Sequence, residues 1–381
     1  MKEYDIAVMK GDGIGPEVVN EGMKVLETAA DVCGEKIRFT SYPFGSDYYL
    51  KNKEVLPQSA MEEFKGHEAI FFGSTGDPRV KPGILEIGLV LKLRFELDQY
   101  INLRPVKLYP NVTSPLKDVD TLDFYVIREN TEDFYNGMGT VFHNGNDSFE
   151  RSLSVHRNSY DADFTMKASF SEDDDYSVSL GLLSRKNTRR VMEYSFNLAK
   201  RKGKSRVTAV DKSNVLPDLY SLWREEFIKT ANKYPEMVTE FTFVDAIAMF
   251  FVEKPDKYDV VVAPNLFGDI ITDLGAAISG GLGCAAGANI NPEGVSMFEP
   301  IHGSAPDIAG KGIANPTATI LSAALMMDNI GSPKMADMIE TAVCDVLQKG
   351  MVRTRDVGGT GTTKDFGNAV CKSLKNIFGR K

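Results

Sequence analysis

Cysteine is scarce in this chain, with four residues among 381. Cys33, Cys284, Cys344 and Cys371 lie far apart, show no C-x-x-C spacing and have no histidine close by in the sequence. Disulfide frameworks and zinc sites normally need such spacing. The pattern argues against both and predicts small core residues or inert surface thiols.

Long apolar runs and an excess of positive charge are also missing. No segment reaches the roughly 18 apolar residues that a membrane helix needs, and the formal net charge of -9 argues against a general affinity for nucleic acid. The first residues precede neither an apolar leader region nor an Arg-rich amphipathic segment. We expect a cytoplasmic protein with neither nucleic-acid nor membrane partners.

The remaining composition is typical of globular proteins, and a chain of this length usually forms two domains. Short β-like runs alternate with helical patterns, which indicates an α/β fold with a largely parallel sheet. In such sheets, ligands gather at the carboxyl ends of strands. The predicted strands are Tyr4–Met9, Ile37–Tyr42, Ala69–Phe72, Phe124–Ile127, Val207–Val210 and Val260–Val262, and the predicted helices are Glu17–Ala30, Asn187–Lys200 and Leu219–Lys233.

Residues 138–182 depart from this alternation. Strand-like stretches at Phe149–His156 and Tyr176–Leu183 flank an acidic run at residues 172–175. This pattern predicts a protruding antiparallel arm, with the acidic run as a solvated surface.

A glycine-rich turn, Gly11–Glu17, follows the first predicted strand and opens the first predicted helix. It does not match the G-x-G-x-x-G dinucleotide fingerprint, because the third glycine comes one place early and Pro16 follows it. Proline suits the first turn of a helix. We interpret the segment as a tight strand-to-helix turn that lines a site and not as part of a Rossmann fold.

Two carboxylates lie four residues apart in the apolar run Asn265–Asp273. If the segment after Gly268 is helical, Asp269 and Asp273 project from one face, where their like charges repel. A divalent cation such as Mg²⁺ or Mn²⁺ would compensate this repulsion and keep positions open for substrate oxygens. A solvated helix edge explains the pair equally well at this point.

Several longer motifs resemble the β-decarboxylating dehydrogenases of (2R)-2-hydroxy acids, the isocitrate/isopropylmalate dehydrogenase family. The resemblance runs from residue 5 to about residue 367. The motifs are Gly11–Val18, Arg94 with Leu103–Pro105, Arg128–Tyr135, Asp211–Asn214, Asn265–Asp273 and Glu299–Asp307.

The resemblance implies the two-domain, non-Rossmann fold of that family. We expect a large cofactor-side domain of residues 1–99 and 280–381, a small domain of residues 100–279, and an active site between them. The arm, at about residues 138–182, would interlock with that of a second subunit. The expected assembly is a homodimer with shared active sites.

The resemblance also assigns metal and acid–base residues. Asp269 and Asp273 match the family's metal carboxylates, and Asp245 matches the one contributed by the neighbouring subunit. Lys212 resembles the base that takes the hydroxyl proton of the substrate, and Tyr135 resembles the acid that protonates the enol carbon. A bound cation would favour the alkoxide and then the enolate, and with nearby arginines it would lower the pKa of Lys212.

Three arginines, Arg94, Arg104 and Arg128, match the residues that hold the substrate carboxylates, and Asn214 lies in the motif of Lys212. The planar guanidinium group suits bidentate binding of carboxylates. Taken singly, each arginine would be more typical of a surface ion pair.

The expected cofactor is NAD. Asp307 can accept hydrogen bonds from ribose hydroxyls but repels a 2′-phosphate, whereas the NADP-dependent isocitrate enzymes have Lys there, usually followed by Tyr. Here Ile308 follows. Further expected cofactor contacts are Thr75, His302, Gly303, Ser304, Ala305 and Asn315.

Substrate choice in the family depends on the segment before the first arginine, here Gly83–Arg94. The isocitrate enzymes place a Ser and an Asn there for a third carboxylate, and neither is present. Ile87, Gly88, Val90 and Leu91 would instead offer an apolar wall to an alkyl substituent. This favours 3-isopropylmalate.

Other markers point elsewhere. The spacing up to Arg94 and the segment Asp98–Val106 look most like tartrate or D-malate dehydrogenases, and Arg128–Tyr135 looks like the isocitrate group. Isocitrate and homoisocitrate remain weaker alternatives, and the arm is longer than is usual for isopropylmalate enzymes. A non-catalytic regulatory paralogue is the alternative of a different class, although the expected metal and acid–base residues are all present.

Overall fold

The computed structural model describes residues 2–143, 149–172 and 174–379. The chain divides into two compact units, each with strands and helices. Unit 1 comprises Met1–Tyr125, Phe250–Lys257 and Thr272–Lys381, and unit 2 comprises Val126–Met249 and Tyr258–Ile271.

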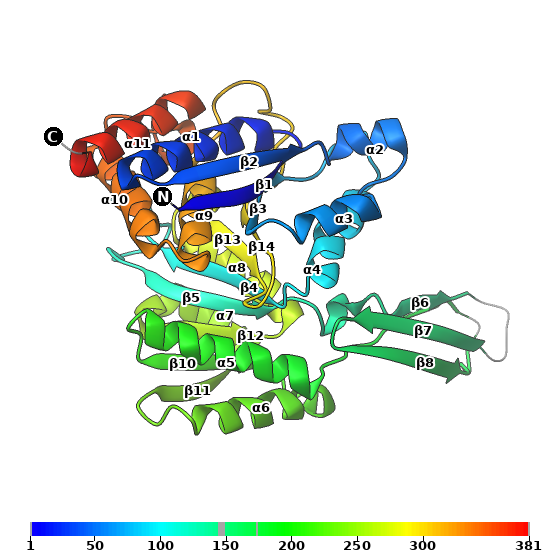
Figure 1. The fold of residues 1–381 in the computed structure, drawn as a ribbon. Helices are drawn as coiled ribbons and strands as arrows, with labels where there is room; N and C mark the ends of the chain where they lie inside the picture. Colours follow the sequence, from blue (N-terminus) through cyan, green and yellow to red (C-terminus); the bar gives the residue numbers. More distant parts are fainter. Residues whose placement is uncertain (1, 144–148, 173, 380–381) are drawn as a thin grey trace. The chain divides into compact units, whose positions relative to one another are not determined.

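The strands of unit 1 have the order β4-β13-β14-β3-β1-β2 (Figure 1). Strand β1 is parallel to β2 and β3, and β14 is parallel to β3, whereas β13 is antiparallel to both β4 and β14. The prediction of a largely parallel sheet is confirmed, and β13 is an antiparallel strand within it. The bounds are Glu3–Gly11 for β1, Lys36–Tyr42 for β2, Ala69–Ser74 for β3, Ile101–Lys107 for β4, Ala286–Ile290 for β13 and Ser296–Pro300 for β14.

Helix α1, Gly15–Cys33, shows how the sequence builds this unit. Pro16 lies in its first turn, and Gly34 ends it in the left-handed conformation with a φ of 73°. Its buried face packs against β3 and the helices α9, α10 and α11. The other helices are α2 (Ser46–Asn52), α3 (Gln58–Phe64), α4 (Lys92–Glu96), α9 (Thr317–Asn329), α10 (Pro333–Lys349) and α11 (Thr363–Phe378), with a π-helical turn η1 (Glu86–Leu91) and 3₁₀ turns η4 (Leu282–Cys284) and η5 (Arg355–Val357).

In unit 2 the strand order is β11-β10-β12-β5, and β10 is parallel to both of its neighbours. Every residue of β12 is buried, which its run of three valines predicts. The other bounds in unit 2 are Arg206–Asp211 for β10, Val238–Phe243 for β11 and Val260–Ala263 for β12, with the helices α5 (Arg185–Arg201) and α6 (Pro217–Ala231) and the 3₁₀ turn η2 (Phe134–Asn136). Strand β5 (Asp123–Glu129) and the helices α7 (Val244–Glu253) and α8 (Asn265–Ile278) have residues in both units, and the 3₁₀ turn η3 (Pro255–Lys257) belongs to unit 1.

The predicted antiparallel arm is confirmed. Strands β7 (Phe149–Arg157) and β8 (Tyr160–Ala168) form a hairpin (Figure 1). Strand β6 (Gly139–Phe142) pairs with β9 (Tyr176–Ser179). Strand β9 ends four residues before the predicted boundary at Leu183. Residues 144–148 of the expected arm and Asp173 of the acidic run lie outside the described residues.

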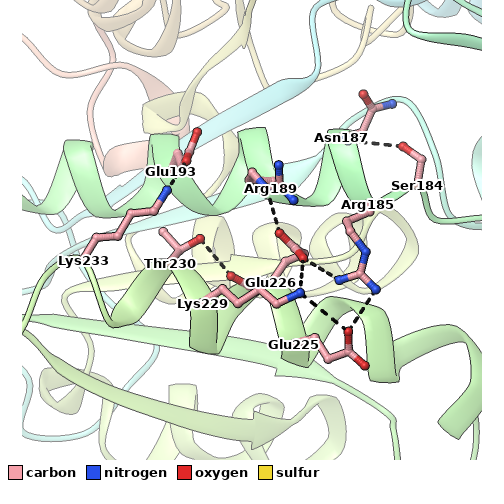
Figure 2. Close-up of polar contacts among 10 residues, drawn as sticks. All are labelled: Ser184, Arg185, Asn187, Arg189, Glu193, Glu225, Glu226, Lys229, Thr230 and Lys233. Carbon is pink, nitrogen blue, oxygen red and sulfur yellow. Dashed lines mark hydrogen bonds and ion pairs between the residues drawn. The ribbon is translucent and has the colours of Figure 1, made fainter.

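Helices α5 and α6 are joined by charged side chains, which we call the α5–α6 ion-pair cluster (Figure 2). The buried carboxylate of Glu226 accepts hydrogen bonds from Arg185 Nη1 at 2.5 Å and Arg189 Nε at 2.8 Å, and Lys229 lies 3.1 Å away. Glu225 pairs with Arg185 at the exposed edge, at 3.0 Å. Burial alone would raise the pKa of Glu226, but the hydrogen bonds from the two arginines and Lys229 outweigh it and lower the pKa to about 2.

Among the described residues, no helix is both long and apolar enough to cross a membrane.

Candidate active site

Helix α8 carries the two carboxylates that the sequence singled out. The segment is helical, as expected, so Asp269 and Asp273 lie one turn apart. Asp273 is exposed, and the side chain of Asp269 is 43% exposed. Residues 2–143, 149–172 and 174–379 contain no group of three or more His, Cys, Asp and Glu side chains placed to hold a metal ion. The pair therefore fits a metal only as part of an open site that receives ligands from elsewhere.

Arg128 and Tyr135 converge on Asp269. Arg128, at the end of β5 and 2% exposed, forms an ion pair with Asp269 Oδ1 and donates from Nε to Asn265 Oδ1 at 2.9 Å. The Tyr135 hydroxyl donates to Asp269 Oδ2 at 2.6 Å, and the Tyr135 ring lies 4.9 Å from the guanidinium carbon of Arg128. Two residues expected to touch substrate are thus fixed to one expected metal carboxylate.

Gly268 makes room for Arg128 on helix α8. A Cβ at this position would lie 2.6 Å from both Cβ and Cγ of Arg128, which is closer than real side chains approach. The glycine before Asp269 is therefore a requirement of packing, because Arg128 crosses the helix surface at this point.

Asp133, which sequence reasoning did not single out, anchors the loop that bears Tyr135. Its φ of 62° and ψ of -133° are unusual for a residue with a side chain. Its carboxylate accepts hydrogen bonds from the Leu266 N–H at 2.9 Å and the Tyr220 hydroxyl at 3.2 Å, and its backbone pairs with Leu182. Burial raises the pKa of Asp133. The anchors come from α6 and the start of α8, so tertiary contacts hold this conformation.

A buried carboxylate, Glu129, lies at the start of the same loop. It accepts hydrogen bonds from the N–H and hydroxyl of Thr131, at 2.7 and 2.9 Å, and from the N–H of Glu132 at 2.8 Å. Burial and the nearby charge of Glu132 raise the pKa of Glu129. The loop between Arg128 and Tyr135 is thus held by hydrogen bonds within itself, at Glu129, and by hydrogen bonds to other elements, at Asp133.

The expected base, Lys212, follows the last residue of β10 and pairs with Asp245 on α7. The distance from Nζ to Asp245 Oδ1 is 2.6 Å, and this hydrogen bond lowers the pKa of Asp245. Arg224 instead pairs with Asp211, the residue before Lys212, at 2.6 Å. Asn214, expected near substrate, is exposed. Within this chain, Lys212 and Asp245 form a pair of their own.

The other two expected substrate arginines are buried in unit 1, where Arg94 lies on α4 and Arg104 on β4. Arg94 Nη2 lies 3.7 Å from Glu299 Oε1, and Arg104 Nε donates to Asn102 Oδ1 at 2.6 Å. Neither Glu299 nor Asn102 received a role from the sequence, although both lie in or beside the quoted motifs.

The residues of the expected apolar wall all lie on the π-helical turn η1. Ile87 is 65% exposed, whereas Val90 and Leu91 are half-buried. Val90 packs against the hydrophobic core that includes Leu89 and Leu93. Of the wall side chains, Ile87 is thus the most available to a ligand.

The expected adenosine loop begins after β14 and meets the glycine-rich turn. The Ile14 N–H donates to the carbonyl of Ser304 at 2.8 Å, and a Cβ on Gly13 would lie 1.9 Å from that same oxygen. Ala305 has a φ of 42°, and Ile308 packs on Ile14. The glycine-rich turn is therefore a tight strand-to-helix turn, as predicted, and it supports the loop.

His302 offers an acceptor to a ligand. Its Nδ1 lies 2.9 Å from the Gly303 carbonyl, which places the proton on Nδ1, and burial lowers its pKa. Nε2 is buried and has no hydrogen-bond partner among the described residues. Gly303 is open at its Cβ position, Asp307 is exposed, and Asn315 donates to Asp356 at 2.8 Å. This loop fits a nucleotide that brings its own donors.

Thr75 is held by Asp12, the acid within the glycine-rich turn. Asp12 Oδ2 lies 3.5 Å from Thr75 Oγ1 and accepts from the Gly76 N–H at 3.0 Å. Asp12 Oδ1 accepts from both the N–H and the hydroxyl of Ser46, at 2.7 and 2.6 Å. The sequence signal for the role of Asp12 in holding this segment was an acidic residue between two glycines directly after a predicted strand.

Known proteins are similar to nearly the whole chain. A model of the isocitrate/isopropylmalate dehydrogenase family matches residues 5–370. The chain is 43% identical over 373 residues to the 3-isopropylmalate dehydrogenase of Thermobifida fusca (strain YX), with 97% of each chain covered. It is 40% identical over 381 residues to a probable tartrate dehydrogenase/decarboxylase of Bacillus subtilis (strain 168), with 99% of each covered. The crystal structure of isocitrate dehydrogenase from Methylococcus capsulatus superposes with a TM-score of 0.83 at 31% identity, over 98% of this chain and 99% of that one.

Proposed function

We propose that this chain oxidises and decarboxylates 3-isopropylmalate with NAD. The premise is that the chain belongs to the isocitrate/isopropylmalate dehydrogenase family and is a decarboxylating dehydrogenase. The observation that carries the choice of substrate is the segment before buried Arg94. It presents exposed Ile87 and no Ser or Asn that could meet a third carboxylate. An alkyl group fits such a surface, whereas an unpaired carboxylate is penalised there.

The three arginines would bind the substrate carboxylates. Arg94 and Arg104 are held in place by hydrogen-bonded or charged neighbours, and Arg128 is held by Asn265. Because these side chains are ordered before substrate arrives, little conformational entropy is lost on binding.

Asp245, Asp269 and Asp273 would hold Mg²⁺ or Mn²⁺, which favours the substrate alkoxide and then the enolate when bound. Hard carboxylate oxygens suit either ion. Residues 302–308, with Thr75 and Asn315, would hold NAD, which would supply the acceptor for the hydride. Asp307 favours it over NADP because a carboxylate repels a 2′-phosphate.

Lys212 and Tyr135 would move the protons. Lys212 takes the proton of the substrate hydroxyl, and Tyr135 returns one to the enol carbon. Lys212 Nζ donates to Asp245 Oδ1 at 2.6 Å, which places the proposed base beside an expected metal carboxylate. Tyr135 in turn donates to Asp269, so its hydroxyl is held in place for proton transfer.

We further propose a homodimer with shared active sites. The third carboxylate, Asp245, pairs with Lys212, and the described part of the chain gathers no three-acid cluster. A second subunit that contributes both Lys212 and Asp245 would complete the metal site. Closed two-fold dimers are the commonest form of such sharing.

Tartrate or D-malate is the second candidate substrate. The 40% identity to the probable tartrate dehydrogenase/decarboxylase over the full chain favours it, as does the segment Asp98–Val106.

The test is a comparison of kcat/KM for 3-isopropylmalate, D-malate, tartrate, isocitrate and homoisocitrate, each with NAD and NADP and with Mg²⁺, Mn²⁺ or EDTA. Burial of the three isopropyl carbons, at about 0.8 kcal/mol each, predicts a preference of about 50-fold over D-malate. Removal of the metal by EDTA should abolish turnover. Preference for D-malate or tartrate would contradict the substrate proposal, and no reduction of NAD with any diacid would favour the regulatory paralogue.

A further inference from the structure

Two buried arginines of unit 1, Arg94 and Arg104, are connected by one chain of polar side chains. Arg104 Nε donates to Asn102 Oδ1 at 2.6 Å, and Asn102 Nδ2 donates to Asn289 Oδ1 at 2.8 Å. Asn289 Nδ2 then donates to Glu299 Oε1 at 2.7 Å, and the same oxygen lies 3.7 Å from Arg94 Nη2. We call this set the arginine-bridging network.

The direction of the network is fixed by its ends. The guanidinium group of Arg104 can only donate, and the carboxylate of Glu299 can only accept. Each amide between them must therefore present its oxygen toward Arg104 and its nitrogen toward Glu299. A flipped Asn102 or Asn289 would set donor against donor or acceptor against acceptor in a buried place.

The backbone places these side chains on one face of adjacent strands. Asn102 on β4 lies directly opposite Asn289 on β13, and Glu299 on β14 lies opposite Gly287. Asn102 and Asn289 are fully buried, and Glu299 is 8% exposed. Side chains in such positions have little freedom to adjust, so the spacing of the network is set by the sheet.

Gly287 makes room for the guanidinium group. A Cβ at this position would lie 3.2 Å from Cζ, Nε and Nη1 of Arg104. The guanidinium group of Arg104 therefore lies over Gly287 on β13.

We propose that Asn102, Asn289 and Glu299 are positioning residues, which fix the separation and orientation of Arg94 and Arg104 so that these two arginines bind a substrate with two carboxylates. The network holds two like charges in place, with the single negative charge of Glu299 beside Arg94. This inference rests on the proposed function, because it assumes that Arg94 and Arg104 bind a diacid.

The test is Asn289→Leu, which keeps a side chain of similar size but removes both central hydrogen bonds. The KM for the diacid should rise about 10- to 100-fold, since small displacements of a binding group cost this much. The KM for NAD should stay within about twofold. Asn289→Asp still accepts a hydrogen bond from Asn102 but repels Glu299. It should likewise raise the KM for the diacid and leave the KM for NAD within about twofold.

Asn291→Leu is the matched control. Asn291 comes directly after β13, the strand that carries Asn289. The side-chain amide of Asn291 donates to the Leu97 carbonyl at 2.9 Å, outside the arginine-bridging network. This variant should lose stability without the selective effect on the diacid. Equal changes in both KM values, or an unchanged KM for the diacid in Asn289→Leu, would overturn the proposal.

Binding measurements separate this inference from the proposed function. If the wild type turns over no 2-hydroxy diacid, the proposed function fails, and calorimetric titration of the same diacids into wild type and variants tests the network alone. A weaker Kd in Asn289→Leu but not in Asn291→Leu would then still support the proposal. Equal affinities in all three proteins, or no binding to the wild type, would overturn it.

Discussion

At the scale of single residues, the close contact between Gly268 and Arg128 gives a sharp prediction. Gly268→Ala adds a Cβ where Arg128 Cβ and Cγ lie 2.6 Å away. Alanine favours a helix over glycine by about 1 kcal/mol, so any loss must come from displaced Arg128. We expect kcat/KM for the diacid to fall about 100-fold, because the arginine and the Asp269 that it pairs with would both shift.

Gly275→Ala is the control for this substitution. Gly275 lies on the same helix, and its added Cβ would meet Val106 Cγ2 at 2.8 Å instead of a site residue. Thermal melting and steady-state kinetics of both variants distinguish the two effects. Comparable kinetic losses in both would contradict a special role for the contact with Arg128.

The residues that carry charge or act as acids and bases were named from sequence because their motifs are contiguous. Asp133 and Asn289 were not, because their roles exist only through partners distant in the chain. Asp133 needs Tyr220 and the Leu266 N–H, and Asn289 needs Asn102 on another strand. No local pattern reveals such partners, whereas Asp12 carried a local signal between two glycines.

At the scale of elements, the α5–α6 ion-pair cluster predicts how acid acts on unit 2 (Figure 2). The pKa of Glu226 is lowered to about 2, below its unfolded value of about 4.3. Its stabilising contribution is therefore present above about pH 4.3 and is lost as the pH falls toward 2. Glu226→Gln should lower the free energy of unfolding by about 2 kcal/mol at pH 7 and by progressively less below pH 4.

Glu225→Gln is the matched control, because Glu225 is the exposed neighbour in the same helix. Its ion pairs with Arg185 and Lys229 lie in solvent, and such pairs contribute about 0–1 kcal/mol. Urea denaturation of both variants between pH 3 and pH 7 is the measurement. An equal, pH-independent effect of the two substitutions would show that burial of Glu226 has no special role.

Elements with strong periodicity were predicted well, and elements that depend on tertiary context were not. The valine-rich β12 and the amphipathic α1 and α5 appear where expected. Strand β13, with the sequence Ala-Gly-Ala-Asn-Ile, has weak β propensity and was missed although all five of its residues are buried. The π-helical turn η1 was also missed, since its sequence has the apolar pattern of an ordinary helix.

At the scale of the whole molecule, the proposed dimer can be tested by complementation. Lys212→Ala and Asp269→Ala homodimers should both be inactive. In a 1:1 mixture after subunit exchange, half of the dimers are hybrids with one complete site each, so about a quarter of wild-type activity should return. The measurement is NAD reduction before and after exchange, with exchange proven by mass spectrometry. Proven exchange without recovered activity would show that the sites are not shared.

The family and its fold were predictable from sequence because the motifs recur in order along most of the chain, and the family match over residues 5–370 confirms this. The group on the third carbon of the substrate was harder to predict. In the proposed site it would depend on a few apolar side chains, of which Ile87 is exposed while Val90 also packs in the core. An apolar residue that packs in the core is apolar for that reason alone, so its presence in the sequence is weak evidence for a contact with substrate.

The discontinuous course of unit 1 has a consequence for synthesis on the ribosome. Unit 2 ends at Ile271, so all of its residues have been made while β13, β14 and helices α9 to α11 are still to come. Strand β3 is made early, yet its neighbour β14 begins only at Ser296. Because domains fold as units once their residues are available, unit 2 is complete first, and the early strands of unit 1 must wait for the last third of the chain.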